Sequence, residues 1–163
     1  MDNINHSEDT LIAGLQSRFF QAMAARERGD VDGAAELLRG ILRVEPRLPE
    51  PRMELANILL IADQLVEAEE HLRAAIVSLE TGGQWTEDLP EDVVLSLAYG
   101  TLGEVLRRQA DADAIVFGNP GAFEALLTES RASFKKAAAL DPENAHAGYW
   151  SFDPRQRGIV AEE

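Results

Sequence analysis

Three histidines are the first residues of this sequence to consider for chemistry, because imidazole binds metals and transfers protons near neutral pH. His6, His71 and His146 lie far apart in the chain. None of them combines a partner at the i, i+4 spacing of a helical zinc site with a third ligand nearby. The chain has no cysteine, which excludes a thiolate zinc site, a redox motif and a cysteine nucleophile. We therefore expect no metal site.

Other reactive residue types occur in patterns that do not complete a known site. Asp111 and Asp113 begin like a calcium loop, but apolar residues follow where further ligands and a glycine are needed. Ser130 and Ser133 lie in a helical pattern with no base in reach. The pair Gly82-Gly83 lacks the Lys-Ser or Lys-Thr that completes a phosphate-binding loop. The sequence predicts a protein that is not an enzyme and needs no cofactor.

Composition limits the kinds of partner. The 163 residues include 15 Lys and Arg against 29 Asp and Glu, a net charge of -14. This charge repels nucleic acid and anionic membranes, and it also keeps a protein soluble. No apolar stretch approaches the roughly 18 residues of a membrane span, and no signal peptide is visible. We expect a cytoplasmic protein with a single domain over residues 1–163.

An internal repeat in the sequence indicates where helices lie. Residues 31–46 align with residues 65–80, so that each matched pair lies 34 positions apart. Gly29-Asp30 precedes the first of these segments, and glycine permits the left-handed conformation that ends a helix. Asp63-Gln64 takes the same place before the second segment and is a weaker stop. The matched pairs are Val31 with Leu65, Ala34 with Ala68, Glu36 with Glu70, Leu38 with Leu72, Arg39 with Arg73, and Leu42 with Ile76.

This period, with a proline at Pro46, resembles the tetratricopeptide repeat (TPR). The first-helix signature of that family is clearest at Tyr99, Leu102, Gly103 and Leu106. The resemblance implies an all-α fold, a right-handed α-solenoid of about three helix hairpins. We expect repeat 1 at 7–46, repeat 2 at 49–80, a linker at 81–93, repeat 3 at 94–142 with an insert at 111–125, and a capping stub and tail at 143–163. The first helix is expected to start near Ser7, which is a good N-cap residue.

The insert makes the third hairpin longer than the others. Its centre, residues 118–121, reads Gly-Asn-Pro-Gly, which is typical of a turn, and the flanks keep helical spacing. We therefore predict about two extra turns on each helix of this hairpin. The apolar residues near the tip either pack on each other across the hairpin or contact another protein: Ile115, Val116, Phe117 and Phe123.

Aromatic residues mark two further departures from the plain repeat. Trp85 lies in the linker and is expected to fill a gap between helix layers; the alternative is that it is exposed to bind a ligand. Tyr149, Trp150 and Phe152 lie in a stub that Asp153-Pro154 prevents from continuing as a helix. We expect the stub to cover the last hairpin, and the alternative is that it inserts into a groove of another copy or another protein.

The resemblance also implies a binding surface, because first helices line the concave face in this family. Family members that capture a C-terminal carboxylate use Lys, Arg and Asn there, and only Asn57 matches that set. The apolar types favour an apolar or amphipathic peptide; the alternative is that Phe19, Met53 and Leu60 are core. The candidate groove residues are Phe19, Met23, Met53, Asn57, Leu60, Ile61, Arg107 and Arg108, with Glu54, Leu97, Thr101 and Glu104 at neighbouring positions.

The sequence therefore predicts a non-catalytic adaptor whose concave groove binds a peptide or helix of a partner protein. One alternative is an assembly or secretion chaperone that keeps a specific client soluble. The other is a structural subunit that assembles with itself through the hairpin tip and the aromatic stub.

Overall fold

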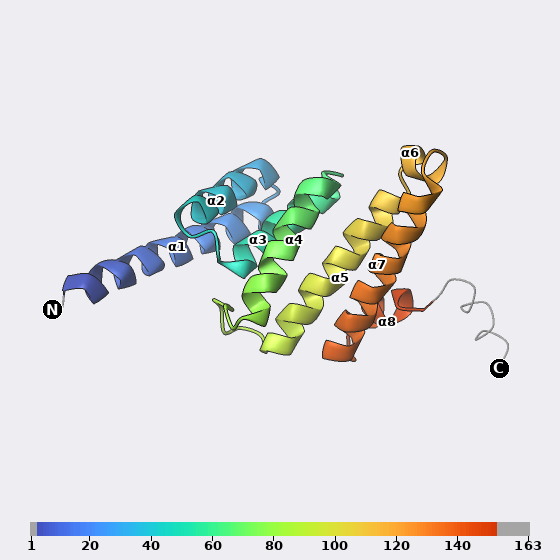
Figure 1. The fold of residues 1–163 in the computed structure, drawn as a ribbon. Coiled ribbons are helices and arrows are strands. Elements are labelled where there is room, and N and C mark those ends of the chain that lie inside the picture. The colour runs from blue at the N-terminus through green and yellow to red at the C-terminus, as the bar shows by residue number, and fades with distance from the viewer. Residues whose placement is uncertain (1–2, 153–163) are drawn as a thin grey trace.

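The structure is a computed structural model that describes residues 3–152, so the expected tail at 153–163 lies outside the described part. Within this range the chain forms eight helices and no strand (Figure 1). The helices are α1 (Asn3–Glu27), α2 (Val31–Val44), α3 (Pro49–Ile61), α4 (Leu65–Glu80), α5 (Glu91–Ala110), α6 (Asp113–Val116), α7 (Pro120–Leu140) and α8 (Ala145–Trp150).

Helix pairs stack in chain order along the molecule (Figure 1). The helices of each pair pack together as α1 with α2, α3 with α4, and α5 with α7, while α2 contacts α3 and α4 contacts α5. Helix α8 packs against α7 at the end of the stack. The first helices α3 and α5 also touch directly. The expected all-helical α-solenoid of hairpins is therefore confirmed.

Residues that lie 34 positions apart in the sequence occupy equivalent buried positions in the core. Ala34 and Ala68 are both fully buried, as are Leu38 and Leu72. These side chains belong to one core cluster that extends from α1 to α5. A stack of this kind buries its apolar stripes between neighbouring pairs, so each pair depends on the next for its stability.

The turn within each of the first two hairpins has the predicted chemistry. Gly29 has φ 84°, and Asp30 then caps α2 by accepting a hydrogen bond from the Gly33 amide at 2.9 Å. Asp63 takes the corresponding left-handed conformation with φ 59°. A side chain in this region costs energy that glycine avoids, which agrees with the weaker stop predicted there.

Close packing of α5 against α7 depends on Gly103. A Cβ atom at this position would lie 2.9 Å from the ring of Phe134, which is closer than packed atoms approach. The Ser130 hydroxyl donates a hydrogen bond to the Gly103 carbonyl oxygen at 2.7 Å. Ser130 and Ser133 are both buried, so both belong to the packed interior. The absence of a side chain at Gly103 therefore permits this close packing.

One expectation about helix ends is wrong. Helix α1 begins at Asn3 and Ser7 lies inside it, so Ser7 is not its N-cap. The helix has 25 residues against 14 in α2, and its N-terminal part extends beyond α2 (Figure 1). Helix α5 begins at Glu91, within residues 81–93, with Pro90 at its N-cap position. Proline has a fixed φ and lacks the amide hydrogen, so it is well suited to a helix start.

The insert also differs from the expected pair of extended helices. Helix α5 ends at Ala110, because Ala112 has an extended backbone (φ -63°, ψ 134°) that interrupts the helical hydrogen bonding. The chain then forms the short helix α6, which turns back onto α7. Asn119 caps α7 by accepting a hydrogen bond from the Ala122 amide, and Pro120 is its first residue. Only the second helix of the hairpin therefore receives the predicted extension within the insert.

The linker is held by a buried carboxylate. Glu50, near the start of α3, is only 8% exposed. Its Oε1 atom accepts hydrogen bonds from the backbone amides of Trp85 and Thr86, each at 2.9 Å, and from the Thr86 hydroxyl at 3.2 Å. The Trp85 ring packs against Phe19 of α1 with the ring centroids 5.6 Å apart. The Trp85 side chain thus packs on α1 and is half-buried there.

Candidate functional site

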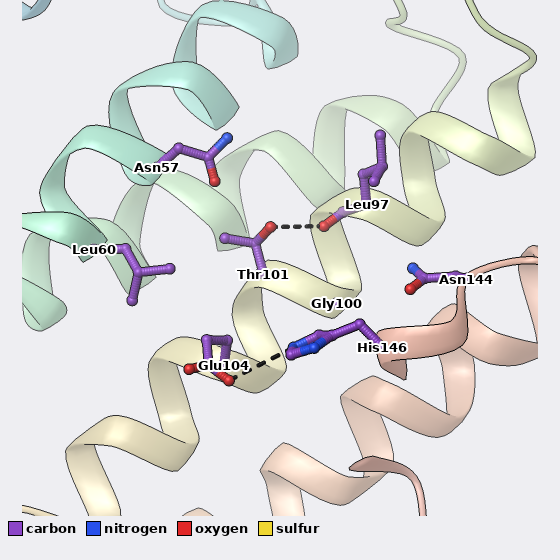
Figure 2. Close-up of a pocket in the computed structure, with 8 residues that line it drawn as sticks. All are labelled: Asn57, Leu60, Leu97, Gly100, Thr101, Glu104, Asn144 and His146. Carbon is purple, nitrogen blue, oxygen red and sulfur yellow. Dashed lines mark hydrogen bonds and ion pairs between the residues drawn. The ribbon is translucent and has the colours of Figure 1, made fainter. Parts of the chain in front are cut away.

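A hollow of about 260 Å³ lies between α3, α5 and the segment that leads into α8. We call it the α3–α5 hollow. Figure 2 shows its side chains, with α3 on one side and α8 on the other. It is lined by Asn57 and Leu60 from α3, by Leu97, Gly100, Thr101 and Glu104 from α5, and by Asn144 and His146.

Helical spacing brings these residues together. The four positions from α5 follow an i, i+3, i+4, i+7 pattern, which places them on one face of the helix. Asn57 and Leu60 are three residues apart on α3 and therefore also share a face. Thr101 donates its hydroxyl hydrogen to the Leu97 carbonyl oxygen at 2.9 Å (Figure 2), which keeps its methyl group available to the hollow. The result is a surface that is partly apolar and partly polar.

Asn144 fixes the far wall of the hollow. Its side-chain oxygen caps α8 by accepting a hydrogen bond from the Ala147 amide at 3.0 Å. Its side-chain nitrogen donates to Ser96 Oγ at 3.1 Å, and Ser96 donates to the Ala137 carbonyl oxygen at 2.8 Å. Because this chain of hydrogen bonds joins three helices, it fixes the position of the wall.

Glu104 is the centre of charge in the hollow. Its carboxylate accepts hydrogen bonds from Arg107 at 2.8 and 3.1 Å and from Arg108 at 3.1 Å. His146 Nε2 lies 3.7 Å from the same carboxylate (Figure 2). Burial opposes ionisation of Glu104, but the hydrogen bonds and charges of Arg107 and Arg108 outweigh it and lower its pKa. The carboxylate therefore stays charged at neutral pH.

Arg107 and Arg108 differ in how far their side chains are exposed to solvent. Arg107 also pairs with Asp111 at 3.2 Å, and its guanidinium lies 4.5 Å from the centre of the Trp150 ring. Arg108 is the more exposed of the two and reaches the Leu60 carbonyl oxygen at 3.4 Å. Arg108 is thus the cation at the edge of the hollow, whereas Arg107 is engaged in contacts within the fold.

The predicted groove residues occupy several places. Asn57 and Leu60 line the α3–α5 hollow. Phe19, Met23 and Met53 are half-buried and pack against the core, as does Leu60. Ile61 is 76% exposed at the end of α3. The structure therefore brings together only part of the predicted set, and it places Phe19 beside the linker instead.

The predicted secondary contact residues also divide by exposure. Phe117 is 84% exposed and Val116 is exposed, whereas Ile115 and Phe123 are half-buried at the tip of the third hairpin. Trp150 stacks on Phe134 of α7, so this residue of the stub covers its own chain. The side chains of Tyr149 and Phe152 are 60% and 59% exposed.

Sequence reasoning missed Gly100, Asn144 and His146 as parts of the hollow. Asn144 carries a readable signal, because asparagine directly before a helical segment is a common N-cap. His146 gives no such signal, since only the packing of α8 against α7 carries it to the side of α5.

No cluster of three potential metal ligands occurs among the residues that the structure describes. None of the described helices is long and apolar enough to cross a membrane.

His71 lies outside the hollow and gives the fold a pH dependence. Arg52 donates a hydrogen bond to its Nδ1 atom at 3.0 Å. Burial, and next the charge of Arg52, lower the pKa of His71 below its ordinary value of 6.5. Between the folded pKa and 6.5 the unfolded chain therefore binds more protons than the folded chain, so stability falls as the pH falls through this window.

We expect urea unfolding to detect this loss of stability when the pH is lowered from above 6.5 to below it. The effect of one proton cannot exceed about 1.4 kcal/mol per pH unit. The variant His71→Gln should show a smaller pH dependence over the same range. An identical pH dependence in both proteins would contradict the assignment to His71.

Antiparallel helix pairs stacked into an α-solenoid, with a hollow on their first helices, define a helical-repeat scaffold. The solved structure titled "First TPR of Spaghetti (RPAP3) bound to HSP90 peptide SRMEEVD" matches 91% of this chain and 94% of its own, with a TM-score of 0.62 and 14% sequence identity. The fold is therefore that of a TPR domain, as the repeat period predicted. No protein-family model matches the sequence, and the search of curated proteins gives no match either.

Proposed function

We propose that this protein is a non-catalytic adaptor that binds a peptide or helix of a partner protein in the α3–α5 hollow. The observation that carries the proposal is the composition of this hollow on the first helices. It offers apolar surface at Leu60 and Leu97 and amide groups at Asn57 and Asn144. A recognition site of this kind needs a mainly apolar surface with a few fixed polar groups.

The structural neighbour supports a peptide as the ligand, because that domain was solved with the HSP90 peptide SRMEEVD. The residues of this chain point to a different peptide. Leu97 and Thr101 line the hollow where a carboxylate clamp would need basic or amide groups. We infer a segment with an apolar side chain facing Leu60 and Leu97, and with an acidic group near Arg108.

Half-buried Met53 and Leu60 pack on the core, so a charge at these positions would threaten folding. Leu97 is 45% exposed and is the better position for a test. In affinity purification from the native cells, Leu97→Glu should lose the partner, with affinity reduced about tenfold or more. The matched control is Val66→Glu, at a residue of α4 that is 68% exposed. Unchanged partners in the Leu97→Glu sample would contradict the proposal, provided that circular dichroism shows a folded protein.

Assembly with itself is a second candidate function, favoured by exposed apolar side chains at two places. Phe117 at the hairpin tip is 84% exposed and Tyr149 is 60% exposed. Light scattering after size exclusion separates this function from that of a monomeric adaptor.

A chaperone would use the same hollow as an adaptor, but it would co-purify with one client in a fixed ratio. A cytoplasmic location agrees with each of these functions.

A further inference from the structure

A second hollow, of about 480 Å³, lies between α1 and the linker, and we call it the linker hollow. Phe19, Phe20 and Trp85 form its aromatic wall. Glu87 and Asp88 of the linker complete its other side. These residues are separate from those of the α3–α5 hollow, so the two hollows can be tested independently.

The aromatic wall presents apolar surface to solvent. Phe20 is 72% exposed, although it lies only one residue from Phe19, which packs against the Trp85 ring. Gln16, Phe19 and Phe20 follow an i, i+3, i+4 pattern and share one face of α1. The Trp85 backbone is tied to Glu50, so the opposite side of the wall is held in place. A fixed apolar surface of this kind is typical of a protein contact.

The charge beside this wall is of one sign. Glu87 and Asp88 are exposed, and Glu91 and Asp92 follow them in the first turn of α5. None of these four carboxylates takes part in an ion pair with the described residues. The nearest cation in the sequence of α1, Arg18, lies about half a turn away from the face that carries Phe19 and Phe20. The linker hollow therefore combines aromatic side chains with unneutralised negative charge.

We propose that the linker hollow binds a positively charged amphipathic segment of a partner protein. Aromatic or aliphatic side chains of this segment contact Phe20 and Trp85, and its Lys or Arg side chains pair with Glu87 and Asp88. Charge complementarity selects this partner over an acidic or neutral one. The ion pairs form at the exposed edge of the hollow, so binding weakens as salt is added.

Fluorescence anisotropy with labelled model peptides tests the proposal on the full chain. The probe is an amphipathic peptide of Leu, Phe and Lys, and its partner probe has every Lys replaced by Glu. The Lys peptide should bind and the Glu peptide should not. Phe20→Ser should weaken binding of the Lys peptide about tenfold, because the apolar contact is lost. The double variant Glu87→Lys, Asp88→Lys should weaken it by at least as much and should reduce its dependence on salt.

Matched controls identify the surface that is used. Val66→Ser removes an exposed apolar side chain from α4, and Glu70→Lys, Glu124→Lys makes the same change of charge elsewhere. These variants should bind the Lys peptide as the natural chain does, and so should Leu97→Glu. Equal binding of both peptides, equal loss in the controls, or no binding of the Lys peptide would overturn the proposal. A dimer that Phe20→Ser converts to a monomer would also overturn it, because the occupant would then be a second copy.

Discussion

Phe134→Ala should lower the free energy of unfolding by about 3–5 kcal/mol, the usual cost of removing a buried aromatic ring. Phe134 is 1% exposed and fills the space that Gly103 leaves between α5 and α7. Its ring also stacks on Trp150 and meets the edge of His146. The variant therefore leaves a cavity and removes the support of α8 together with one wall of the α3–α5 hollow. Urea unfolding followed by circular dichroism measures the loss.

Phe117→Ala is the matched control for this prediction. The side chain of Phe117 is of the same type but is 84% exposed at the hairpin tip. Its removal should change the free energy of unfolding by less than about 0.5 kcal/mol, as is usual at surface positions. A loss below about 1 kcal/mol for Phe134→Ala would contradict this prediction, because it would show that α5 and α7 close around the missing ring.

Glu50→Ala should lower the free energy of unfolding by about 2–3 kcal/mol and release the linker. Three donors in the linker lose their acceptor, and a hydrogen bond to a charged group contributes about 1.5–3 kcal/mol. Part of this loss is offset because the freed linker regains contact with water. The tryptophan emission should shift to the red as Trp85 leaves its contact with Phe19. Urea unfolding and fluorescence of the same samples measure the two effects.

Glu50→Gln separates the acceptor from the charge. The Oε2 atom of Glu50 is buried and has no hydrogen-bond partner among the described residues, which is a costly state for a carboxylate. Glutamine keeps one acceptor oxygen and removes the charge, so this variant should lose less than half as much stability as Glu50→Ala. Glu70→Ala, at an exposed position of α4, should stay within about 0.5 kcal/mol of the natural chain. Equal losses in Glu50→Ala and Glu50→Gln would show that the charge is what holds the linker.

Both hollows arise where the chain departs from a plain repeat. The α3–α5 hollow has its far wall in the stub, through Asn144 and His146. The linker hollow exists because residues 81–90 form no helix and return to α3 and α1. Regular repeats therefore supply the scaffold, and the added segments supply much of the surface that a partner would contact.

Features that depend on local periodicity can be predicted from the amino-acid sequence alone. The 34-residue spacing gives the helix pairs, because matched residues such as Leu38 and Leu72 must face the same core. Gly29 marks a turn by its backbone freedom, and residues 118–121 mark the break before α7 by their turn chemistry. These signals lie within a few residues of the structure they specify, so they can be read without knowledge of the fold.

The contacts between side chains of different helices are set by the three-dimensional packing. It divided the predicted groove, with Leu60 beside Glu104 in one hollow and Phe19 against Trp85 in another. The fold also pairs Arg107 with Glu104 and places its guanidinium over the Trp150 ring, and it buries Glu50 beneath the linker. The angle between stacked pairs and the path of an irregular linker depend on contacts between residues far apart in sequence, and a local pattern carries no information about these contacts.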